Sequence, residues 1–546
     1  PTSFSVRLTP SLFSHRSPTI YFDYPISPSR KDEYVEDGLE CQKDILYRST
    51  WKRRCIADTF STAGLFLKHS SRKGNWSCAW TNHLSIERLK SLHRYQKVNH
   101  FPGSWCIGRK DNLCKCLRQA RHQSRKPLCL SKRKPTSAFD HHPETWILPK
   151  QYKEWARVSI NDQSSIFILK PSAGSCGKGI KLIDKTRRKI VPQDRPCILQ
   201  RYIKDPYLIN GKKFDLRLYV LVTSYDPLTI FMYNEGLVRF SSSRYTLRNL
   251  SNRYSHLTNV AVNKQNKENT RLSDSSRGIS PKKRTAAETS GKWTLEQLWG
   301  YLGKMEQKES IQECKKAIDE VVIKTIIASE VQVLNKVHSS VKFPKTCFEL
   351  FGFDVLLDEK LKPWLLEVNI SPSLMSPSAL DYKLKTSLLA DIFHLIGLVI
   401  PDKKISTKVD VKGQCGVKGM VPASSVRKKM ESRAKSEWRK NRFSTKGISM
   451  NNFERDDWEV IYDFEDEFSR RGNFRLLFPS TDCENYLPYF STQRFKMCLL
   501  CSWILKGREQ HQETVDERQR TERFQTNQTE TSNGKLFARK DLEPLG

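Results

Sequence analysis

The sequence contains no hydrophobic stretch long enough to cross a membrane. Its longest apolar run, Leu388–Ile400, contains Asp391 and His394 and falls short of the ~20 apolar residues that a spanning helix needs. No N-terminal stretch has the pattern of a secretory signal peptide. These absences predict a soluble, intracellular protein that has no membrane partner.

The sequence also lacks a cysteine framework, although 15 cysteines are present. Cys114 and Cys116 flank Lys115, and Cys498 and Cys501 form one CxxC pair without a second pair. A structural zinc site needs four ligands, so the favoured interpretation is scattered reduced thiols in a cytosolic protein.

Acidic residues are scarce compared with basic ones. The chain has 59 Asp and Glu against 94 Lys and Arg, which gives a net charge of +35. A charge of this size predicts an anionic partner, which could be a nucleic acid, an acidic membrane face or an acidic protein. No RNA- or DNA-binding motif is present, so a specific nucleic-acid partner is not expected.

Composition divides the chain into four parts. Residues 1–75 are Ser/Pro-rich and then basic, and we expect little order there. Residues 76–401 hold the core, within which the polar, Ser-rich segment 265–291 is predicted to be a mobile insertion. Residues 402–506 form a basic extension, with 14 basic and three acidic residues between Lys403 and Lys446, and residues 507–546 are predicted to be a disordered tail.

Strand-like and helix-like patterns alternate through the core. Short apolar runs bounded by Pro, Gly or charge predict buried strands at Ile166–Leu169, Ile180–Ile183, Cys197–Ile203, Phe214–Val222, Thr229–Tyr233, Phe348–Leu357 and Pro363–Ile370. Helical spacing predicts helices in Trp293–Val337 and Tyr382–Leu398. This alternation indicates an α/β or α+β core.

Two motifs carry clustered charge and glycine. KPSAGSCGKGI (170–180) is a glycine loop that can cradle a phosphate between Lys170 and Lys178, although it has neither the Walker A nor the GxGxxG spacing. By itself it is equally consistent with a surface loop. In KFDLR (213–217), strand alternation puts Lys213, Asp215 and Arg217 on one face, and the solvated face of an edge strand is the alternative.

A third constellation comes from FGFDVLLD (351–358) and KPWLLEVNISPSL (362–374). Asp354 and Glu367 lie in apolar strands, and Asn369 shares a face with Glu367. Two carboxylates and an amide oxygen suit Mg²⁺, while a buried salt-bridge network is the alternative. Together with the glycine loop and the lysines, they favour a nucleotide site that transfers a γ-phosphoryl group.

These motifs occur in an order that resembles the tubulin tyrosine ligase-like family. The matching segments are NHFPGSWCIGRKDNL (99–113), TWILP (145–149), KPSAGSCGKGI, LQRYI (199–203), KFDLR, YNEGLVRF (233–240), HLTN (256–259) and FGFDVLLDEKLKPWLLEVNISPSL (351–374). The resemblance covers roughly Trp76–Pro401, and FEDEFSRRGNFRLLFPS (464–480) extends it loosely into the region beyond the core. Within the family, the chain looks closest to the polyglutamylase branch, members four and five. The resemblance implies an ATP-grasp core with a basic, largely helical C-terminal extension.

The resemblance also implies roles for individual residues, with ATP and Mg²⁺ as cofactors. The residues expected to bind the nucleotide are Lys170 and Gly177 at the phosphates, Gln200, Arg201, Tyr202 and Ile203 beside adenine, and Lys213, Asp215, Thr258 and Asn259. Asp354, Glu367 and Asn369 are expected to hold Mg²⁺. Arg217 is expected at the γ-phosphate, and Arg239 and Lys292 in the pocket for the incoming amino acid. The candidate catalytic residues are Arg217, Glu367 and Arg239.

The activity implied is glutamate ligation through an acyl-phosphate, onto side chains of tubulin or another acidic protein. Free glutamate would be the co-substrate, the protein would act as a monomer, and the basic extension would bind microtubules, although a solvated linker is the alternative. The implied location is the cytoplasm and microtubule cytoskeleton, with the basal body or axoneme of a cilium as a finer possibility. Cys176, Val260 and Ala261 depart from the family pattern, so a microtubule-binding member with lost or altered specificity, for example for glycine, is the second hypothesis.

Overall fold

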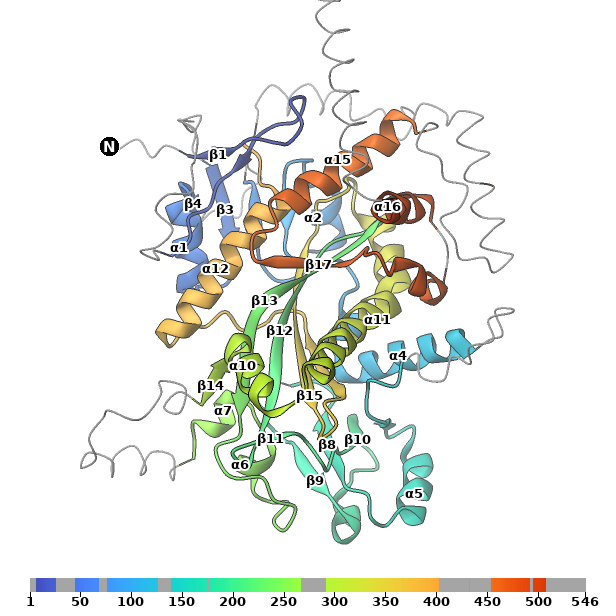
Figure 1. The fold of residues 1–546 in the computed structure, drawn as a ribbon. Coiled ribbons are helices and arrows are strands. Elements are labelled where there is room, and N and C mark those ends of the chain that lie inside the picture. Colours follow the sequence, from blue (N-terminus) through green and yellow to red (C-terminus); the bar gives the residue numbers. More distant parts are fainter. Residues whose placement is uncertain are drawn as a thin grey trace, which may run out of the picture.

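A computed structural model describes residues 6–25, 45–67, 76–125, 139–174, 177–266, 291–401, 432, 453–491 and 494–506. Helices surround several sheets (Figure 1), so the predicted α/β class is confirmed. Within this part of the chain, no helix is both long and apolar enough to cross a membrane.

The centre of the fold is a seven-stranded antiparallel sheet. Its main path runs from β14 (Lys292–Thr294) through β13 (Leu228–Phe240), β12 (Lys212–Tyr225) and β15 (Glu349–Leu357) to β16 (Pro363–Asn369). Two further strands are attached, β11 (Leu208–Ile209) to β12 and β17 (Phe474–Phe478) to β13. The alternative interpretation of KFDLR as part of an edge strand is therefore wrong, because β12 is paired on both sides.

Successive side chains of β12 point to opposite faces of the sheet, so the strand contributes to a hydrophobic core on each face. Leu216, Leu218 and Val220 pack with the long helix α11 (Lys308–Ser340), and Tyr219 and Leu221 pack with α12 (Ala379–Ile396). Figure 1 shows these two helices on either side of the long β12–β13 ribbon. Burial on both faces explains why β12 has a nearly continuous apolar sequence.

A second, four-stranded antiparallel sheet lies below the central one in Figure 1. Its order is β7 (Thr145–Leu148), β10 (Cys197–Arg201), β8 (Phe167–Pro171) and β9 (Lys181–Ile183). One face is covered by α5 (Tyr152–Asn161), whose Trp155 packs against Trp146 and Phe167. The short segments η1 (Lys185–Ile190), α6 (Arg253–His256) and α7 (Val260–Asn263) lie around the same sheet's edge.

The N-terminal segments form ordered structure. Parallel strands β4 (Leu65–Leu67), β3 (Ile45–Ser49), β5 (Cys78–Trp80) and β6 (Lys97–Val98) make a third sheet, beside α1 (Arg54–Thr62). A hairpin of β1 (Leu8–Thr9) and β2 (Thr19–Ile20) precedes them.

The expectation of little order in residues 1–75 is wrong for 6–25 and 45–67. Phe22, Tyr47 and Phe60 are buried in one cluster with Phe393 of α12. Phe22 and Phe60 pack onto Phe393, and Tyr47 stacks on Phe60, so contacts with a helix far along the sequence hold these segments in place.

Four helices complete the core. They are α2 (Ile86–Lys90), α3 (Trp105–Gly108), α4 (Lys110–Arg125) and α10 (Leu295–Met305). The helical prediction over Trp293–Val337 is confirmed as α10 and α11, and α10 begins with a capping box between Thr294 and Gln297.

The C-terminal segment from residue 453 is part of the core fold. α15 (Arg455–Ser469) and α16 (Phe495–Leu505) pack together. The sequence between them contains β17, which joins the central sheet, and then η5 (Cys483–Asn485) and η6 (Leu487–Tyr489). The boundary expected near residue 402 is therefore wrong for 453–506. The mixture of acidic and aromatic residues over 453–471 predicts a helix, and α15 confirms it. The basic stretch Lys403–Lys446, apart from Ser432, lies outside the described residues, as do residues 267–290 of the insertion, Cys176 and the 507–546 tail.

Candidate active site

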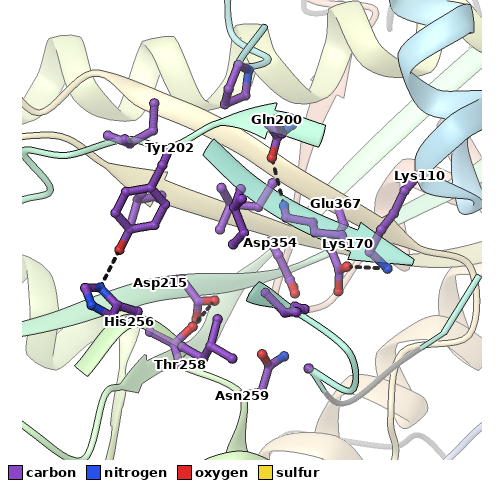
Figure 2. A pocket seen from close by; sticks show the side chains of 18 of the residues that line it. Lys110, Lys170, Gln200, Tyr202, Asp215, His256, Thr258, Asn259, Asp354 and Glu367 are labelled. Atoms are coloured by element: carbon purple, nitrogen blue, oxygen red, sulfur yellow. Dashed lines mark hydrogen bonds and ion pairs between the residues drawn. The ribbon is translucent and has the colours of Figure 1, made fainter. Parts of the chain in front are cut away.

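A cleft runs between the central sheet and the second sheet. Figure 2 shows charged and polar side chains pointing inward from both sheets and from the segment after α6. All ten predicted nucleotide residues line it, with two of the three predicted metal ligands: Lys170, Gly177, Gln200, Arg201, Tyr202, Ile203, Lys213, Asp215, Thr258 and Asn259, and Asp354 and Glu367. The structure thus brings together motifs that are separated by nearly two hundred residues.

Strand register explains how the charges of the central sheet meet. Asp215 of β12 is opposite Arg239 of β13, which in turn is opposite Lys292 of β14. Two residues further along β12, Arg217 is opposite Asp354 of β15, which is opposite Glu367 of β16. Because side chains two residues apart share a face, these two rows lie side by side on the sheet.

The centre of this charged face is a buried ion-pair network. Arg217 Nε donates to Asp354 Oδ1 at 2.6 Å, and Arg239 reaches both Asp215 and Asp354, at 2.7 and 2.8 Å. The Thr258 hydroxyl also donates to Asp215, at 2.6 Å. The two guanidinium groups outweigh the effect of burial and hold the pKa of Asp354 well below its usual range.

Glu367 and Asn369 lie beside this network, Glu367 lining the cleft and Asn369 the pocket next to it. Glu367 forms an ion pair of 3.0 Å with Lys110, and the Asn369 amide is 3.4 Å from the Glu367 carboxylate. Asp354, Glu367 and Asn369 thus offer two carboxylates and an amide from adjacent strands, a donor set that fits Mg²⁺. The alternative salt-bridge interpretation is also visible in the structure, because both carboxylates have cationic partners.

Two buried lysines face the carboxylates from opposite sides of the cleft. Lys170 of β8 donates to Gln200 Oε1 at 2.8 Å, and burial lowers its pKa to about 8. Lys213 donates to the Tyr202 hydroxyl at 3.0 Å, and burial lowers its pKa to about 7 although Asp215 opposes the shift. Ammonium groups removed from water in this way are suited to an anionic ligand such as a polyphosphate.

Gly177 of the glycine loop lines the cleft next to Asn259. A Cβ atom on Gly177 would lie 2.9 Å from Asn259 Oδ1, and the φ of Gly177 is +71°. Glycine at this position therefore permits both the backbone conformation and the close approach.

The side chain of Arg201, at the end of β10, points away from the cleft. The Arg201 guanidinium forms ion pairs with Glu144 and Asp162, at 3.0 and 2.9 Å, outside the cleft. Tyr202 instead points inward, and its hydroxyl is 3.0 Å from His256 Nδ1. Any contact of Arg201 with a nucleotide therefore comes from its backbone.

A second pocket adjoins the cleft, and Asn259 and Glu367 line both. It contains the remaining predicted residues, Arg217, Arg239, Lys292 and Asn369. Its cationic side chains are Arg53, Arg217, Arg239, Lys264, Lys292 and Lys385, against the acidic Glu367 and Asp381. Lys292 and Lys385 both contact Asp381, at 2.8 and 2.9 Å. Val260 and Ala261, which depart from the family pattern, line this second pocket.

Some residues of the site were not singled out from the sequence. Lys110 lies at the start of α4, and only its place in the family-like segment 99–113 pointed to a role in the site. His256 begins the HLTN motif but was given no role. Arg53 and Lys385 come from segments without any charged motif, so no local signal pointed to them.

Two antiparallel sheets facing each other across a cleft of lysines and carboxylates define a protein of the ATP-grasp type. A model of the tubulin-tyrosine ligase family matches residues 87–406, and the chain belongs to this family.

Curated relatives extend the match beyond this domain. A tubulin monoglutamylase, TTLL4 of Mus musculus, is 38% identical over 516 residues, which cover 91% of this chain and 40% of the relative. The tubulin polyglutamylase ttll-4 of Caenorhabditis elegans is 34% identical over 435 residues, covering 78% and 66% of the two chains. The tubulin polyglutamylase TTLL5 of Homo sapiens is 36% identical over 352 residues, covering 64% and 26%. The chain thus spans less than two thirds of the length of each of these relatives.

Proposed function

We propose that this chain is an ATP-dependent ligase that joins free glutamate, through an isopeptide bond, to glutamate side chains of tubulin or another acidic protein. The printed names of its relatives, tubulin monoglutamylase and polyglutamylase, support the substrate class. ATP is the nucleotide in the cleft, and Mg²⁺ is its metal.

The observation that carries the proposal is the direct connection between the cleft and the cationic second pocket. A ligase of this kind must bring a phosphoryl donor, an acceptor carboxylate and an amino acid to one point. Asn259 and Glu367 line both spaces, and Arg217 and Arg239 lie between them. Six cationic side chains in the second pocket suit two carboxylate-bearing substrates, because guanidinium groups bind carboxylates in a bidentate way.

The chemistry follows from the weak electrophilicity of a carboxylate. Transfer of the γ-phosphoryl group of ATP to the acceptor carboxylate gives an acyl-phosphate with a good leaving group, which the amine of glutamate can attack. Lys110, Lys170 and Arg217 stabilise the charge that develops on the transferred phosphoryl group. When bound by Asp354, Glu367 and Asn369, Mg²⁺ would neutralise phosphate charge.

Mass spectrometry of tubulin after incubation with the protein, ATP and a mixture of amino acids tests the proposal. We expect ATP-dependent mass increments of glutamate residues. Tubulin that gains no mass with ATP present would contradict ligase activity, whereas a gain of glycine would keep the ligase and correct its specificity. This second candidate is favoured by Val260 and Ala261, whose apolar side chains line the pocket for the amino acid.

The charge of the chain supports a further part of the proposal. We infer that the basic stretch Lys403–Lys446 binds the acidic surface of microtubules, because opposite charges steer association. The protein would then act in the cytoplasm at the microtubule cytoskeleton, including the basal body or axoneme of cilia.

A further inference from the structure

A buried polar cluster beneath the second pocket is not used by the reaction described so far. It consists of His100 after β6, Glu349 at the start of β15, and Ser371 after β16. His100 and Glu349 are 5% and 0% exposed, whereas Ser371 is exposed and lines the second pocket. The cluster therefore leads from the protein interior to the wall of the proposed substrate pocket.

The hydrogen bonds of the cluster fix the direction of its donors. Glu349 accepts from His100 Nδ1 at 2.7 Å, from Phe101 N at 3.0 Å and from the Ser104 hydroxyl at 2.9 Å. Although burial raises the pKa of Glu349, three donors around one carboxylate favour its ionised form. His100 Nδ1 thus donates to Glu349, which leaves the lone pair of His100 Nε2 directed at the Ser371 hydroxyl, 3.4 Å away.

The surroundings of His100 make a metal site a poor interpretation of this cluster. His83 stacks on His100 with ring centroids 4.2 Å apart and an interplanar angle of 10°. A metal ion lies in the plane of each imidazole that binds it, so two parallel rings cannot share one ion. His83 also contacts the Ser104 hydroxyl at 2.9 Å, and burial and its neighbour His100 lower its pKa to about 4.

Few other titratable groups reach the cluster. Tyr225 of β12 and Cys347 before β15 interact electrostatically with Glu349, and burial raises the pKa of both. His83, Tyr225 and Cys347 are therefore uncharged near neutral pH. His100 is the member of the cluster whose two ring nitrogens contact Glu349 and Ser371, so it connects the buried carboxylate to the wall of the pocket.

The proposed ligation requires a base that can take a proton from the amine of the incoming glutamate. Free glutamate carries an ammonium group at neutral pH, and an ammonium has no lone pair with which to attack. In the balanced step, RCO–OPO₃²⁻ and R′–NH₃⁺ give RCO–NH–R′, HPO₄²⁻ and H⁺. The amide C–N bond forms, the acyl C–O bond breaks, phosphate leaves with the electron pair and takes one proton, and the other proton must leave the amine before attack.

We propose that Ser371, His100 and Glu349 form a proton relay that deprotonates the incoming amine. This inference rests on the proposed function. The Ser371 hydroxyl accepts the proton from the ammonium while it donates its own to His100 Nε2, and Glu349 stabilises the resulting imidazolium. His100 later releases the proton to solvent by the same route. Ser371 is the residue that touches the substrate, and His100 and Glu349 position and drive the transfer through it.

Comparing two nucleophiles tests the relay. Hydroxylamine is largely uncharged at neutral pH, so it attacks an acyl-phosphate without a base and gives a hydroxamate. For Ser371→Ala and His100→Gln, we expect glutamate ligation at pH 7 to fall about 100-fold, as for loss of a general base. ATP-dependent hydroxamate formation should stay within about twofold of wild type. Glutamate ligation by Ser371→Ala should recover as the pH rises, because hydroxide replaces the relay.

A matched control comes from the same loop. The hydroxyl of Ser373 accepts from Met375 N at 3.4 Å and has no contact with His100. Ser373→Ala should keep the wild-type pH profile. Because Ser371 is exposed, Ser371→Ala should also keep the wild-type melting temperature, which separates the relay from a folding defect at the buried His100.

The outcomes separate the relay from the proposed function. If the two variants lose hydroxamate and glutamate products equally, or lose neither, the relay is wrong while the ligase assignment stands. If wild-type protein forms no hydroxamate with ATP and tubulin, no acyl-phosphate is made, and the proposed function fails together with the relay.

Discussion

The cleft and the second pocket are adjacent but differ in how their charges are balanced. In the cleft, the two carboxylates Asp354 and Glu367 are held in ion pairs, with Arg217 and Lys110 respectively. Six cationic and two acidic side chains line the second pocket, where Lys292 and Lys385 share Asp381, and Arg53 and Lys264 form no ion pair within the described residues. The cleft is therefore organised before any ligand arrives, whereas the second pocket carries surplus positive charge that a substrate can neutralise.

The difference shows how one sheet can support two kinds of binding. Paired charges on β12, β15 and β16 stay ordered because register fixes their neighbours. The cations of the second pocket on β14, α12 and the loop before α1 come from separate segments and converge only in the fold. Substitutions in the cleft should therefore affect the chemical step and the nucleotide, and those in the second pocket the amino acid.

The largest expected effect comes from the cleft. Glu367→Gln should lower ligation by roughly 1000-fold, because it removes a carboxylate of the proposed Mg²⁺ set and leaves Lys110 without its partner. Binding to microtubules should not change in a co-sedimentation assay. Glu359→Gln, an exposed glutamate in the turn between β15 and β16, is the matched control. Turnover retained in Glu367→Gln would remove the metal assignment.

A smaller effect is expected in the second pocket. Lys292→Met should raise the KM for glutamate roughly tenfold, as for loss of a charge-assisted hydrogen bond. The KM for ATP should stay unchanged, because Lys292 does not line the cleft. Steady-state kinetics with each substrate varied in turn gives both values, and Lys304→Met in α10 serves as a control. An equal rise in both KM values would mean that the two spaces do not act separately.

The glycine loop allows a comparable test on the nucleotide side. Gly177→Ala should weaken ATP binding about tenfold, since its Cβ would meet Asn259 Oδ1 at 2.9 Å. Gly174→Ala is a matched comparison, because Gly174 also has a positive φ but no atom within 4 Å of its Cβ position. Calorimetric titration with ATP measures both variants. Similar losses for the two would show that backbone strain matters and the contact with Asn259 does not.

The smallest expected effect is a dependence of ATP binding on pH. Lys213 has a pKa lowered to about 7 in the free protein, and bound phosphate should raise it. The charged form binds ATP, so affinity is highest below pH 7 and falls as the pH rises, by about fivefold from pH 7 to 8. Lys213→Arg stays charged and should keep only the shallower slope that Lys170 contributes, because the pKa of Lys170 is about 8. Calorimetry in buffers of different ionisation enthalpy should also detect proton uptake by wild type, and no uptake would contradict the shifted pKa.

Much of the cleft could be predicted from the sequence. Lys170, Lys213, Asp215, Asp354 and Glu367 were identified because charges inside apolar strands, next to a glycine loop, need a ligand or a partner. Strand positions in β8, β10, β12, β15 and β16 were also predicted closely, since their apolar runs are bounded by clear turn residues.

The second pocket could be predicted only in part. Arg239 and Lys292 were found through the family resemblance, but Arg53 and Lys385 have no sequence signal. The order of the N-terminal segments was also missed, because it depends on contacts of Phe22 and Phe60 with Phe393 of α12, far along the sequence.

The sequence alone determined the family, the α/β class and the chemical types of group in the cleft, because these depend on local patterns of charge, glycine and apolar residues. The tertiary structure decided which charges meet: strand register put Arg239 between two aspartates and Arg217 on Asp354. It also decided that residues 6–25 and 453–506 belong to the core. Register and long-range packing depend on contacts between distant segments, and those contacts are not encoded in any short stretch of sequence.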